Sequence, residues 1–193
     1  MNEDIHADEP VAVRVRRLEE RVIAAGLTSD QELDAILDFI YQNASPLNGA
    51  RIVARAWVNP GFRQRLLAEA GDAIGELGFE ARGYRLVAVE NTPELHNMIV
   101  CTLCSCYPVS LLGPSPSWYR SLAYRARAVR DPRAVLSEFG LTLPDGVEVA
   151  VWDASAETRY LVVPVRPAGT EGKPEEELAR LVTRNGLIGT AAH

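Results

Sequence analysis

The chain has 193 residues, a formal net charge of -6 and a pI near 5.2, and 47% of its residues are hydrophobic. That hydrophobic content supports a real core in one ordinary domain with an extension, so a disordered chain is excluded. Nucleic acid and anionic membranes do not attract an acidic protein, so no partner of either class is expected, whereas small neutral substrates and protein partners stay open.

The amino terminus and the cysteines both favour the cytoplasm. Residues 1–10 are acidic and polar, and they lack the basic and apolar regions of a secretory signal. No stretch of the sequence is long and apolar enough to span a bilayer. The three cysteines all lie within residues 101–106, so they cannot build an even set of disulfides, and a reducing compartment is expected.

Residues 11–78 are predicted to be helical. The first helix carries a narrow apolar stripe that begins at Val11, and Gly26 ends this helix. Ser29 and Glu32 form a capping box at the start of a second helix.

Two further helices complete this part of the chain. Asn59 followed by Pro60 begins the second of them, which carries apolar side chains along one face from Phe62 to Ile74. The apolar stripes would pack either on the chain's own core or on another subunit, and the sequence leaves that choice open. Residues 1–78 are therefore expected to form a helical extension.

The pattern changes to β-structure after Gly83. Residues 84–89 are rich in β-forming residues and are predicted to be a strand. Residues 147–152 and 159–165 are predicted to be two more strands that pair as a hairpin, and Pro164 confines the end of the second to a sheet edge.

Short helices are predicted between and after these strands. One begins at Pro132 and is closed by Gly140, and another begins at Pro174 and ends at Gly186. Residues 79–193 are therefore expected to form the globular domain, and the fold class is α+β.

Residues 101–106, Cys-Thr-Leu-Cys-Ser-Cys, place three soft metal ligands in one short segment. Disulfide bonds do not explain the cluster, because a bridge between cysteines this close is strained and one thiol would be left over. Zinc is an alternative, because Cys101 and Cys104 match half of a zinc knuckle and His96 would complete a Cys₃His site. A zinc site, however, leaves the close spacing of Cys104 and Cys106 unexplained.

The spacing of Cys104, Ser105 and Cys106 suits a different kind of ion. If the amides of Ser105 and Cys106 lose their protons, two sulfurs and two nitrogens close three fused chelate rings around one metal. The four donors then approach a plane, Cys101 reaches an axial position, and a sixth position stays open for water. Ionised amides and thiolates favour a small, highly charged, octahedral ion such as Co(III) or Fe(III).

The Cys-Thr-Leu-Cys-Ser-Cys segment also resembles the metal-binding signature of the nitrile hydratase α-subunit family and of the related thiocyanate hydrolase metal subunit. The resemblance runs from about residue 84 to about residue 190 and is only general over the helical extension. Further segments carry it in the family's order: Glu90 to Asn97, Trp118-Tyr119, Tyr124 to Arg127, Asp131 to Arg133, Val135 to Gly140 and Glu157 to Gly172.

The resemblance implies a layered α/β/β/α globular domain, which is typical of these subunits. It also implies that Cys101 binds as an axial thiolate and that Ser105 and Cys106 supply amide nitrogens. Cys104 is expected to become a sulfinate and Cys106 a sulfenate, which makes a trivalent metal more Lewis acidic. Thr102 matches the cobalt branch of the family, so low-spin non-haem Co(III) is favoured over Fe(III) as the cofactor.

The implied reaction is the hydration of a nitrile to its amide, with catalysis assigned to Cys106 and Ser105. The metal polarises the nitrile or lowers the pKa of bound water. The nucleophile is either the sulfenate oxygen of Cys106 or a metal-bound hydroxide. The resemblance assigns the arginines that hold the oxidised sulfurs to a β-type partner subunit, and it implies an activator or metallochaperone protein.

Departures from the family pattern bear on the substrate. Val109-Ser110 stands where many members carry a tryptophan, which implies a roomier pocket, and Arg82 stands where some members have a glutamine that contacts substrate or water. Residues 111–121 resemble the thiocyanate hydrolase sequence as much as the nitrile hydratase one, so a thiocyanate hydrolase metal subunit is an alternative. With the acidic amino terminus, these features favour a three-subunit member of the toyocamycin type, which acts on a nucleoside nitrile.

Other side chains have a structural and a functional interpretation. His96 is expected to anchor a loop rather than bind metal. Trp118, Tyr119 and Trp152 are expected to lie in the core, and Trp118 is the best candidate among them for lining the pocket. Two non-catalytic alternatives stay open, a zinc-stabilised module and a scaffold whose helical arm assembles partners. Four arginines could orient oxidised sulfurs or form surface salt bridges, namely Arg125, Arg127, Arg159 and Arg166.

Overall fold

The computed structural model describes residues 9–81 and 83–193 of the chain. Contacts divide the chain into two compact units, Met1–Asn43 and Ala44–His193. This division falls before the boundary expected from the sequence, between residues 78 and 79, because the intervening helices pack on the sheets of the second unit. The acidic segment 1–8 and Arg82 lie outside the described residues. Within the described part of the chain, no helix has the length and apolar character needed to cross a membrane.

In its described residues the first unit holds α1 (Val11–Ala24) and α2 (Asp30–Asn43). The second unit begins with α3 (Pro46–Val58), α4 (Pro60–Ala68) and α5 (Ala70–Gly75). Its strands are β1 (Arg85–Glu90), β2 (Leu95–Val100), β3 (Glu148–Asp153) and β4 (Thr158–Val163). The other elements are α6 (Val109–Leu112), the 3-10 helix η1 (Ser117–Arg120), α7 (Leu122–Arg130), α8 (Pro132–Glu138), α9 (Glu175–Ala179) and α10 (Arg184–Ile188).

The two helices of the first unit have the predicted ends. Gly26 adopts a φ of 68° just after α1, a conformation that glycine reaches without strain. In the capping box of α2, the Ser29 amide donates to the Glu32 carboxylate at 2.9 Å, and the Glu32 amide donates to Ser29 Oγ at 3.3 Å. No residue of α1 is buried, and Val15 and Leu18 are 55% and 61% exposed. The described residues of the first unit therefore leave the apolar stripe of α1 uncovered.

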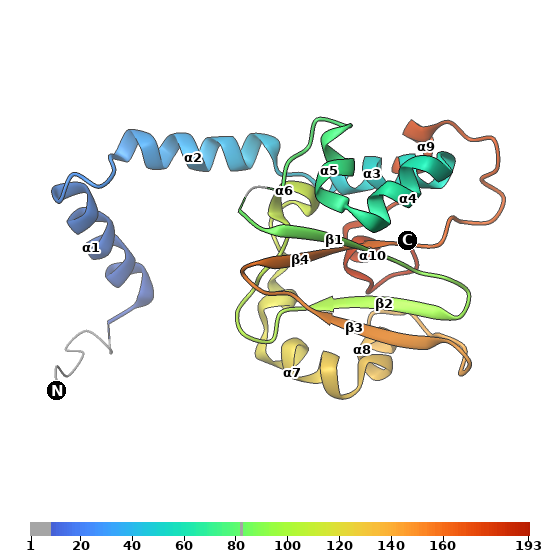
Figure 1. The fold of residues 1–193 in the computed structure, drawn as a ribbon. Helices are drawn as coiled ribbons and strands as arrows, with labels where there is room; N and C mark the ends of the chain where they lie inside the picture. The colour runs from blue at the N-terminus through green and yellow to red at the C-terminus, as the bar shows by residue number, and fades with distance from the viewer. Residues whose placement is uncertain (1–8, 82) are drawn as a thin grey trace. The chain divides into compact units, whose positions relative to one another are not determined.

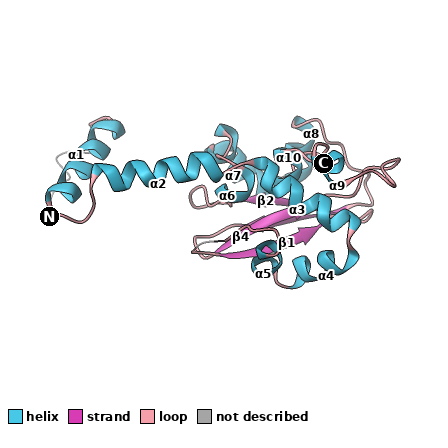
Figure 2. Ribbon diagram, turned by 90° about the horizontal axis from the view of Figure 1, so that it is seen from above, coloured by secondary structure: helices cyan, strands magenta, loops and turns pink. Residues whose placement is uncertain are grey.

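The second unit is built in four layers (Figure 1). Helices α3, α4 and α5 cover the β1–β4 sheet, the β2–β3 sheet stacks on its other side, and α7 and α8 cover the far face of β2–β3. Figure 2 views the unit from above, with the strands in magenta and the flanking helices in cyan. The α+β class is confirmed, in the layer order α/β/β/α.

Both sheets have two parallel strands. β1 pairs with β4, and β2 pairs with β3 so that Val100 at the end of β2 lies opposite Asp153 at the end of β3. The predicted hairpin of residues 147–152 and 159–165 is therefore wrong, because β3 and β4 belong to different sheets. The sequence patterns also missed β2, which is buried on both faces and so lacks an alternation of apolar and polar residues.

Helices α3 to α5 pack on the chain's own core. Ile52, Phe62 and Ile74 are each at most 2% exposed, and burial of such a side chain contributes about 1.5–3 kcal/mol. The Asn59 side chain caps α4 as predicted, because it accepts a hydrogen bond from the Phe62 amide at 2.9 Å. The predicted continuous face is interrupted at Glu69, whose φ of -140° and ψ of 79° end α4 and start α5.

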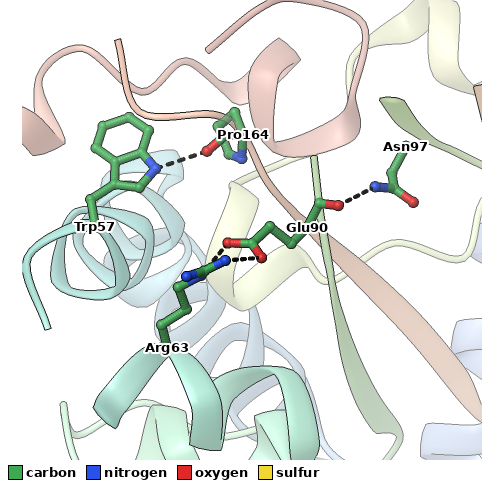
Figure 3. A network of polar contacts seen from close by, with 5 residues as sticks. All are labelled: Trp57, Arg63, Glu90, Asn97 and Pro164. Atoms are coloured by element: carbon green, nitrogen blue, oxygen red, sulfur yellow. Dashed lines mark hydrogen bonds and ion pairs between the residues drawn. The ribbon is translucent and has the colours of Figure 1, made fainter. Parts of the chain in front are cut away.

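Polar contacts tie the helical layer to the strands (Figure 3). Trp57 Nε1 in α3 donates to the carbonyl oxygen of Pro164, just after β4, at 2.8 Å. Arg63 in α4 forms a bidentate ion pair with Glu90 at the end of β1. The side-chain amide of Asn97 in β2 donates to the Glu90 carbonyl at 2.7 Å. These contacts link β1 to β2, and they link the helical layer to the ends of β1 and β4.

The carboxyl-terminal helices differ from the prediction. Pro174 precedes α9 as expected, but α9 ends at Ala179, and Gly186 lies inside α10 rather than ending a helix. The reason is a new cap, because the Thr183 side chain accepts a hydrogen bond from the Gly186 amide at 3.0 Å. Gly189, with a φ of 86°, ends α10.

Substitution of Gly189 by alanine is expected to lower the free energy of unfolding by about 3 kcal/mol or more. A Cβ there would lie 1.9 Å from the carbonyl oxygen of Asn97, and the positive φ disfavours any side chain. Thermal unfolding measures the loss. Gly71→Ala is the control, because an added Cβ meets nothing within 4 Å there. Equal stability of the two variants would contradict the close approach of α10 to β2.

Candidate metal centre

The cysteine cluster lies in the loop that begins where β2 ends. Because β2 and β3 are parallel, their carboxyl ends meet at one edge of the sheet, with Val100 opposite Asp153. Cys101 follows Val100 directly and is fully buried, whereas Cys104 is exposed and Cys106 is half-buried. The loop therefore holds one sulfur in the core and presents two near the surface.

The three sulfur atoms are close enough to bind one ion. Sγ of Cys104 lies 3.6 Å from Sγ of Cys101 and 3.3 Å from Sγ of Cys106. All three sulfurs lie within 4.8 Å of one another. Within residues 9–81 and 83–193, no other group of three His, Cys, Asp or Glu ligand atoms has this spacing. The structure thus brings together the three cysteines that the sequence singled out.

Backbone amides of the loop turn toward the same sulfurs. The N–H of Cys104 donates to Cys101 Sγ at 3.3 Å. The backbone amides of Ser105 and Cys106 also help to lower the pKa of the Cys104 thiol. Three sulfurs and the amides of Ser105 and Cys106 are therefore gathered in one turn, and this donor set fits a trivalent ion bound through thiolates and ionised amides.

The same contacts shift the pKa values of the Cys104 and Cys106 thiols in opposite directions. A hydrogen bond from the Cys106 thiol, helped by the Ser105 amide, lowers the pKa of Cys104 to about 7. Burial raises the pKa of Cys106 to about 12, and its hydrogen bond with Cys104 acts in the same direction. Cys104 is therefore the more nucleophilic of the two at neutral pH.

Alkylation of the metal-free chain is expected to modify Cys104 before the other cysteines. Its exposed thiol ionises as the pH rises through about 7, whereas Cys106 keeps its proton and Cys101 is buried. Brief iodoacetamide pulses at pH 6, 7.5 and 9, followed by peptide mass spectrometry, measure the order. Labelling of Cys106 ahead of Cys104 would show that the loop has a different arrangement.

Two side chains hold the start of the loop. Asp153 at the end of β3 accepts hydrogen bonds from the Thr102 amide at 2.9 Å and from the Thr102 hydroxyl at 2.5 Å. Arg125 in α7 donates to the carbonyl oxygens of Thr102 and Leu103, both at 2.7 Å. The peptide groups that precede Cys104 are thus fixed from both flanking layers.

Two more side chains hold the end of the loop. Arg159 in β4 donates to the Tyr107 carbonyl at 2.7 Å, and its guanidinium lies 4.5 Å from the ring centroid of Tyr84. The Tyr119 hydroxyl donates to the Cys106 carbonyl at 3.0 Å. Burial raises the pKa of Tyr119, so this hydroxyl stays protonated and remains a donor.

His96 does not join the sulfur cluster. Its Nε2 lies 2.7 Å from the Gly189 carbonyl oxygen, and its Nδ1 lies 3.3 Å from the side-chain nitrogen of Asn91. Burial lowers the pKa of His96, which favours the neutral ring. His96 therefore anchors the carboxyl-terminal segment to β2, as expected, and the Cys₃His zinc site is not formed.

Two of the four arginines considered as sulfur clamps lie elsewhere. Arg127 forms a bidentate pair with Glu138 on the surface. Arg166 donates to the backbone carbonyls of Trp57 and Thr170. Arg125 and Arg159 do reach the cluster loop, where they bind backbone carbonyls.

Trp118 packs into an aromatic group beneath the loop. Its ring lies 4.8 Å from that of Tyr124 and 4.6 Å from that of Phe139, between ring centroids. The same ring meets Tyr119 edge-on at 6.0 Å. Trp118 therefore supports the loop through Tyr119, and its expected place in the wall of a substrate pocket stays a prediction.

Asp153 is a residue of this site that the sequence does not single out. The available signal was an acidic residue directly after a predicted strand. In the predicted hairpin of residues 147–152 and 159–165, Asp153 would lie away from the cysteines. Only the parallel pairing of β3 with β2 brings Asp153 beside Cys101.

A family model described as the nitrile hydratase alpha chain matches residues 9–191. The low-molecular weight cobalt-containing nitrile hydratase subunit alpha of Rhodococcus rhodochrous is 52% identical over 186 residues, which cover 96% of this chain and 90% of the relative. The thiocyanate hydrolase subunit gamma of Thiobacillus thioparus is 41% identical over 203 residues, covering 99% and 82%. A solved double mutant of the Fe-type nitrile hydratase from Comamonas testosteroni Ni1 has a TM-score of 0.87 and 44% identity, covering 94% of this chain and 89% of that chain.

These matches extend well beyond the cysteine segment. The resemblance in the sequence begins at about residue 84, whereas the family model already matches from residue 9 and so includes α1 to α5. The similar structure likewise covers nearly the whole chain. The chain therefore belongs to the nitrile hydratase alpha-chain family.

Proposed function

We propose that this chain is the metal-binding α subunit of a nitrile hydratase and that it holds a low-spin Co(III) ion. The proposed ligands are the sulfurs of Cys101, Cys104 and Cys106 and the amide nitrogens of Ser105 and Cys106. The observation that carries this proposal is the gathering of three sulfurs within 4.8 Å, with loop amides directed at them. A closed tetrahedral zinc site would need a fourth ligand, and His96 is engaged elsewhere.

Several observations favour cobalt over iron. The Rhodococcus relative, which is 52% identical to this chain, is named as cobalt-containing. Thr102 at the second position of the cysteine segment matches the cobalt branch. Its hydroxyl binds Asp153, so this side chain is part of the structure that fixes the loop.

The loop offers a buried side and an open side to the bound ion. When bound, the trivalent ion would act as a Lewis acid toward a nitrile or a water molecule. Cys101 would bind it from the core, and the exposed turn from Cys104 to Cys106 would face the substrate. Catalysis is assigned to Cys106 and Ser105 on that open side.

Two cysteines are proposed to carry oxygen, Cys104 as a sulfinate and Cys106 as a sulfenate. The thiolate is the form that oxidants attack, and the low pKa and exposure of Cys104 suit it to that reaction. An oxygen on Cys106 would lie beside the substrate. There it can attack the nitrile carbon or accept the proton of an attacking water.

Thiocyanate is a second candidate substrate. The Thiobacillus relative, named as a thiocyanate hydrolase subunit, aligns with 99% of this chain at 41% identity. Thiocyanate also has a carbon–nitrogen triple bond, so the same site could hydrate it. We favour an organic nitrile, because the cobalt-containing nitrile hydratase relative is the more similar one. A nucleoside nitrile is among the substrates to be tested.

A β-type partner subunit is proposed to complete the site. Cys104 and Ser105 are exposed in this chain, and Leu103 beside them is 85% exposed. A partner would cover these atoms and supply arginines for the oxidised sulfurs. An activator protein that delivers cobalt is proposed as well. The cytoplasm is the proposed compartment, because free thiols are kept reduced there until the metal binds.

The function is tested by purifying the chain together with its β-type subunit after growth with cobalt. Aliphatic, aromatic and nucleoside nitriles and thiocyanate are then supplied, and amide and ammonia formation are measured. Conversion of a nitrile to its amide is expected. Hydration of thiocyanate but of no nitrile would favour a thiocyanate hydrolase subunit instead. A metal-loaded complex that hydrates neither nitriles nor thiocyanate would refute both candidate functions.

A further inference from the structure

Arg125 contacts the peptide group that carries the Cys104 amide. Its Nη2 donates to the carbonyl oxygens of Thr102 and Leu103, both at 2.7 Å. The Leu103 carbonyl and the Cys104 N–H belong to one planar peptide group. That N–H donates to Cys101 Sγ at 3.3 Å. The guanidinium, the peptide and the buried sulfur thus form one continuous series of hydrogen bonds.

The positive charge of Arg125 is directed at this loop. In the described ranges 9–81 and 83–193, no carboxylate forms an ion pair with its guanidinium, and its buried Nε has no hydrogen-bond partner. Arg127 on the same helix differs, because Glu138 neutralises it. Arg125 is half-buried, so its charge acts through a medium less polar than water.

The other contacts of the loop do not reach this peptide group. Asp153 binds the amide and hydroxyl of Thr102, which lie before it. Arg159 and Tyr119 bind the carbonyls of Tyr107 and Cys106, which lie after it. Arg125 is therefore the side chain that acts on the Leu103–Cys104 peptide.

We propose that Arg125 is a positioning residue that polarises the Leu103–Cys104 peptide and thereby strengthens the hydrogen bond from Cys104 N–H to the Cys101 sulfur. A positive charge at the carbonyl oxygen makes the N–H of the same peptide a better donor. A stronger hydrogen bond draws electron density from the sulfur, so Cys101 donates less to the bound metal and the metal becomes more Lewis acidic. This inference rests on the proposed function, because it assumes that Cys101 binds cobalt.

Three variants of the cobalt-loaded complex test the inference. R125Q removes the charge, and R125K keeps a charge but loses the planar guanidinium whose Nη2 reaches two carbonyls. R127Q is the matched control, because Arg127 lies on the same helix and pairs with Glu138 on the surface. The readouts are the energy of the sulfur-to-cobalt charge-transfer absorption and the rate of cobalt release to a chelator.

In R125Q we expect the charge-transfer band to move to lower energy, because the Cys101 sulfur then holds its electrons less tightly. Release of cobalt is expected to be slower, because a Cys101 sulfur with a weaker hydrogen bond donates more strongly to the metal. R125K should lie between R125Q and the unmodified complex. R127Q should match the unmodified complex in both readouts.

An unmoved band and unchanged release rate in R125Q would overturn the inference, as would a band in R125K identical to that in R125Q. If R125Q does not fold, R125K decides alone, and its band must lie at lower energy than that of the unmodified complex. Failure of the proposed function has a different signature. In that case the unmodified complex itself would lack cobalt or a sulfur-to-cobalt band.

Discussion

Replacement of Cys104 by alanine is expected to abolish cobalt retention and to lower nitrile hydration by more than about 100-fold. Cys104 lies between the other two sulfurs, at 3.6 Å and 3.3 Å, so its loss opens the chelate on both sides. Loss of only an outer partner of a metal ligand costs about 10- to 100-fold, and loss of a ligand should cost more. Metal content of the purified complex and amide production measure the effect.

Ser105→Ala is the matched comparison for this variant. The proposed donor at Ser105 is its backbone nitrogen, which alanine keeps, so this variant should retain cobalt. The scaffold alternative makes the opposite prediction for Cys104→Ala, because a chain that only assembles partners would leave the activity of the complex unchanged. Full activity with Cys104→Ala would therefore show that catalysis does not need a metal bound by Cys104.

Replacement of Leu122 by aspartate is expected to weaken association with the β-type subunit by at least about 30-fold, or about 2 kcal/mol. Leu122 is 76% exposed at the start of α7, one turn before Arg125, which contacts the cluster loop. A large apolar side chain so exposed beside an open metal site is suited to burial by a partner. A charge placed in that contact would have to be desolvated without compensation.

Val58→Asp serves as the control for the partner interface. Val58 is 41% exposed at the end of α3, which lies across both sheets from α7 (Figure 1). Sedimentation or titration calorimetry with the purified subunits measures both affinities. Equal affinity for the Leu122 variant and the unmodified chain would place the partner on another face.

Helix ends could be predicted from the sequence because their signals act within a few residues. The side chains of Ser29 and Asn59 make the predicted capping contacts. Gly26 and Gly140 take positive φ where helices stop. Glycine often ends a helix, but the Gly186 amide here donates to the side chain of Thr183, which caps the start of α10.

Strand pairing could not be predicted, because it depends on segments far apart in the chain. Local turn chemistry between β3 and β4 does resemble a hairpin, and the Ser155 amide does donate to the Thr158 carbonyl at 2.8 Å. The two strands nevertheless separate to pair with β2 and β1. The residue pattern of β3 or β4 alone does not indicate which strand it pairs with.

The cysteine ligands could be predicted because their chemistry depends on spacing within six residues. The side chains that hold the loop come from four other elements, α7, β3, β4 and η1, so only the fold brings them together. The sequence therefore does not single out Asp153, and for Arg125 it suggests a contact with oxidised sulfur rather than the contacts with the carbonyls of Thr102 and Leu103. The boundary between the two units lies after Asn43 and not between residues 78 and 79 for the same reason. Helices α3 to α5 pack on the sheets of the second unit, and their own sequence does not show whether they pack there or on another subunit.

We propose that one turn of the chain binds a trivalent cobalt ion through three cysteines, two of which carry oxygen. Metal analysis combined with intact mass of the purified complex tests it most directly. We expect one cobalt per chain and three added oxygen atoms on the peptide that contains residues 101–106, two on Cys104 and one on Cys106. One zinc per chain with three unmodified thiols would contradict it.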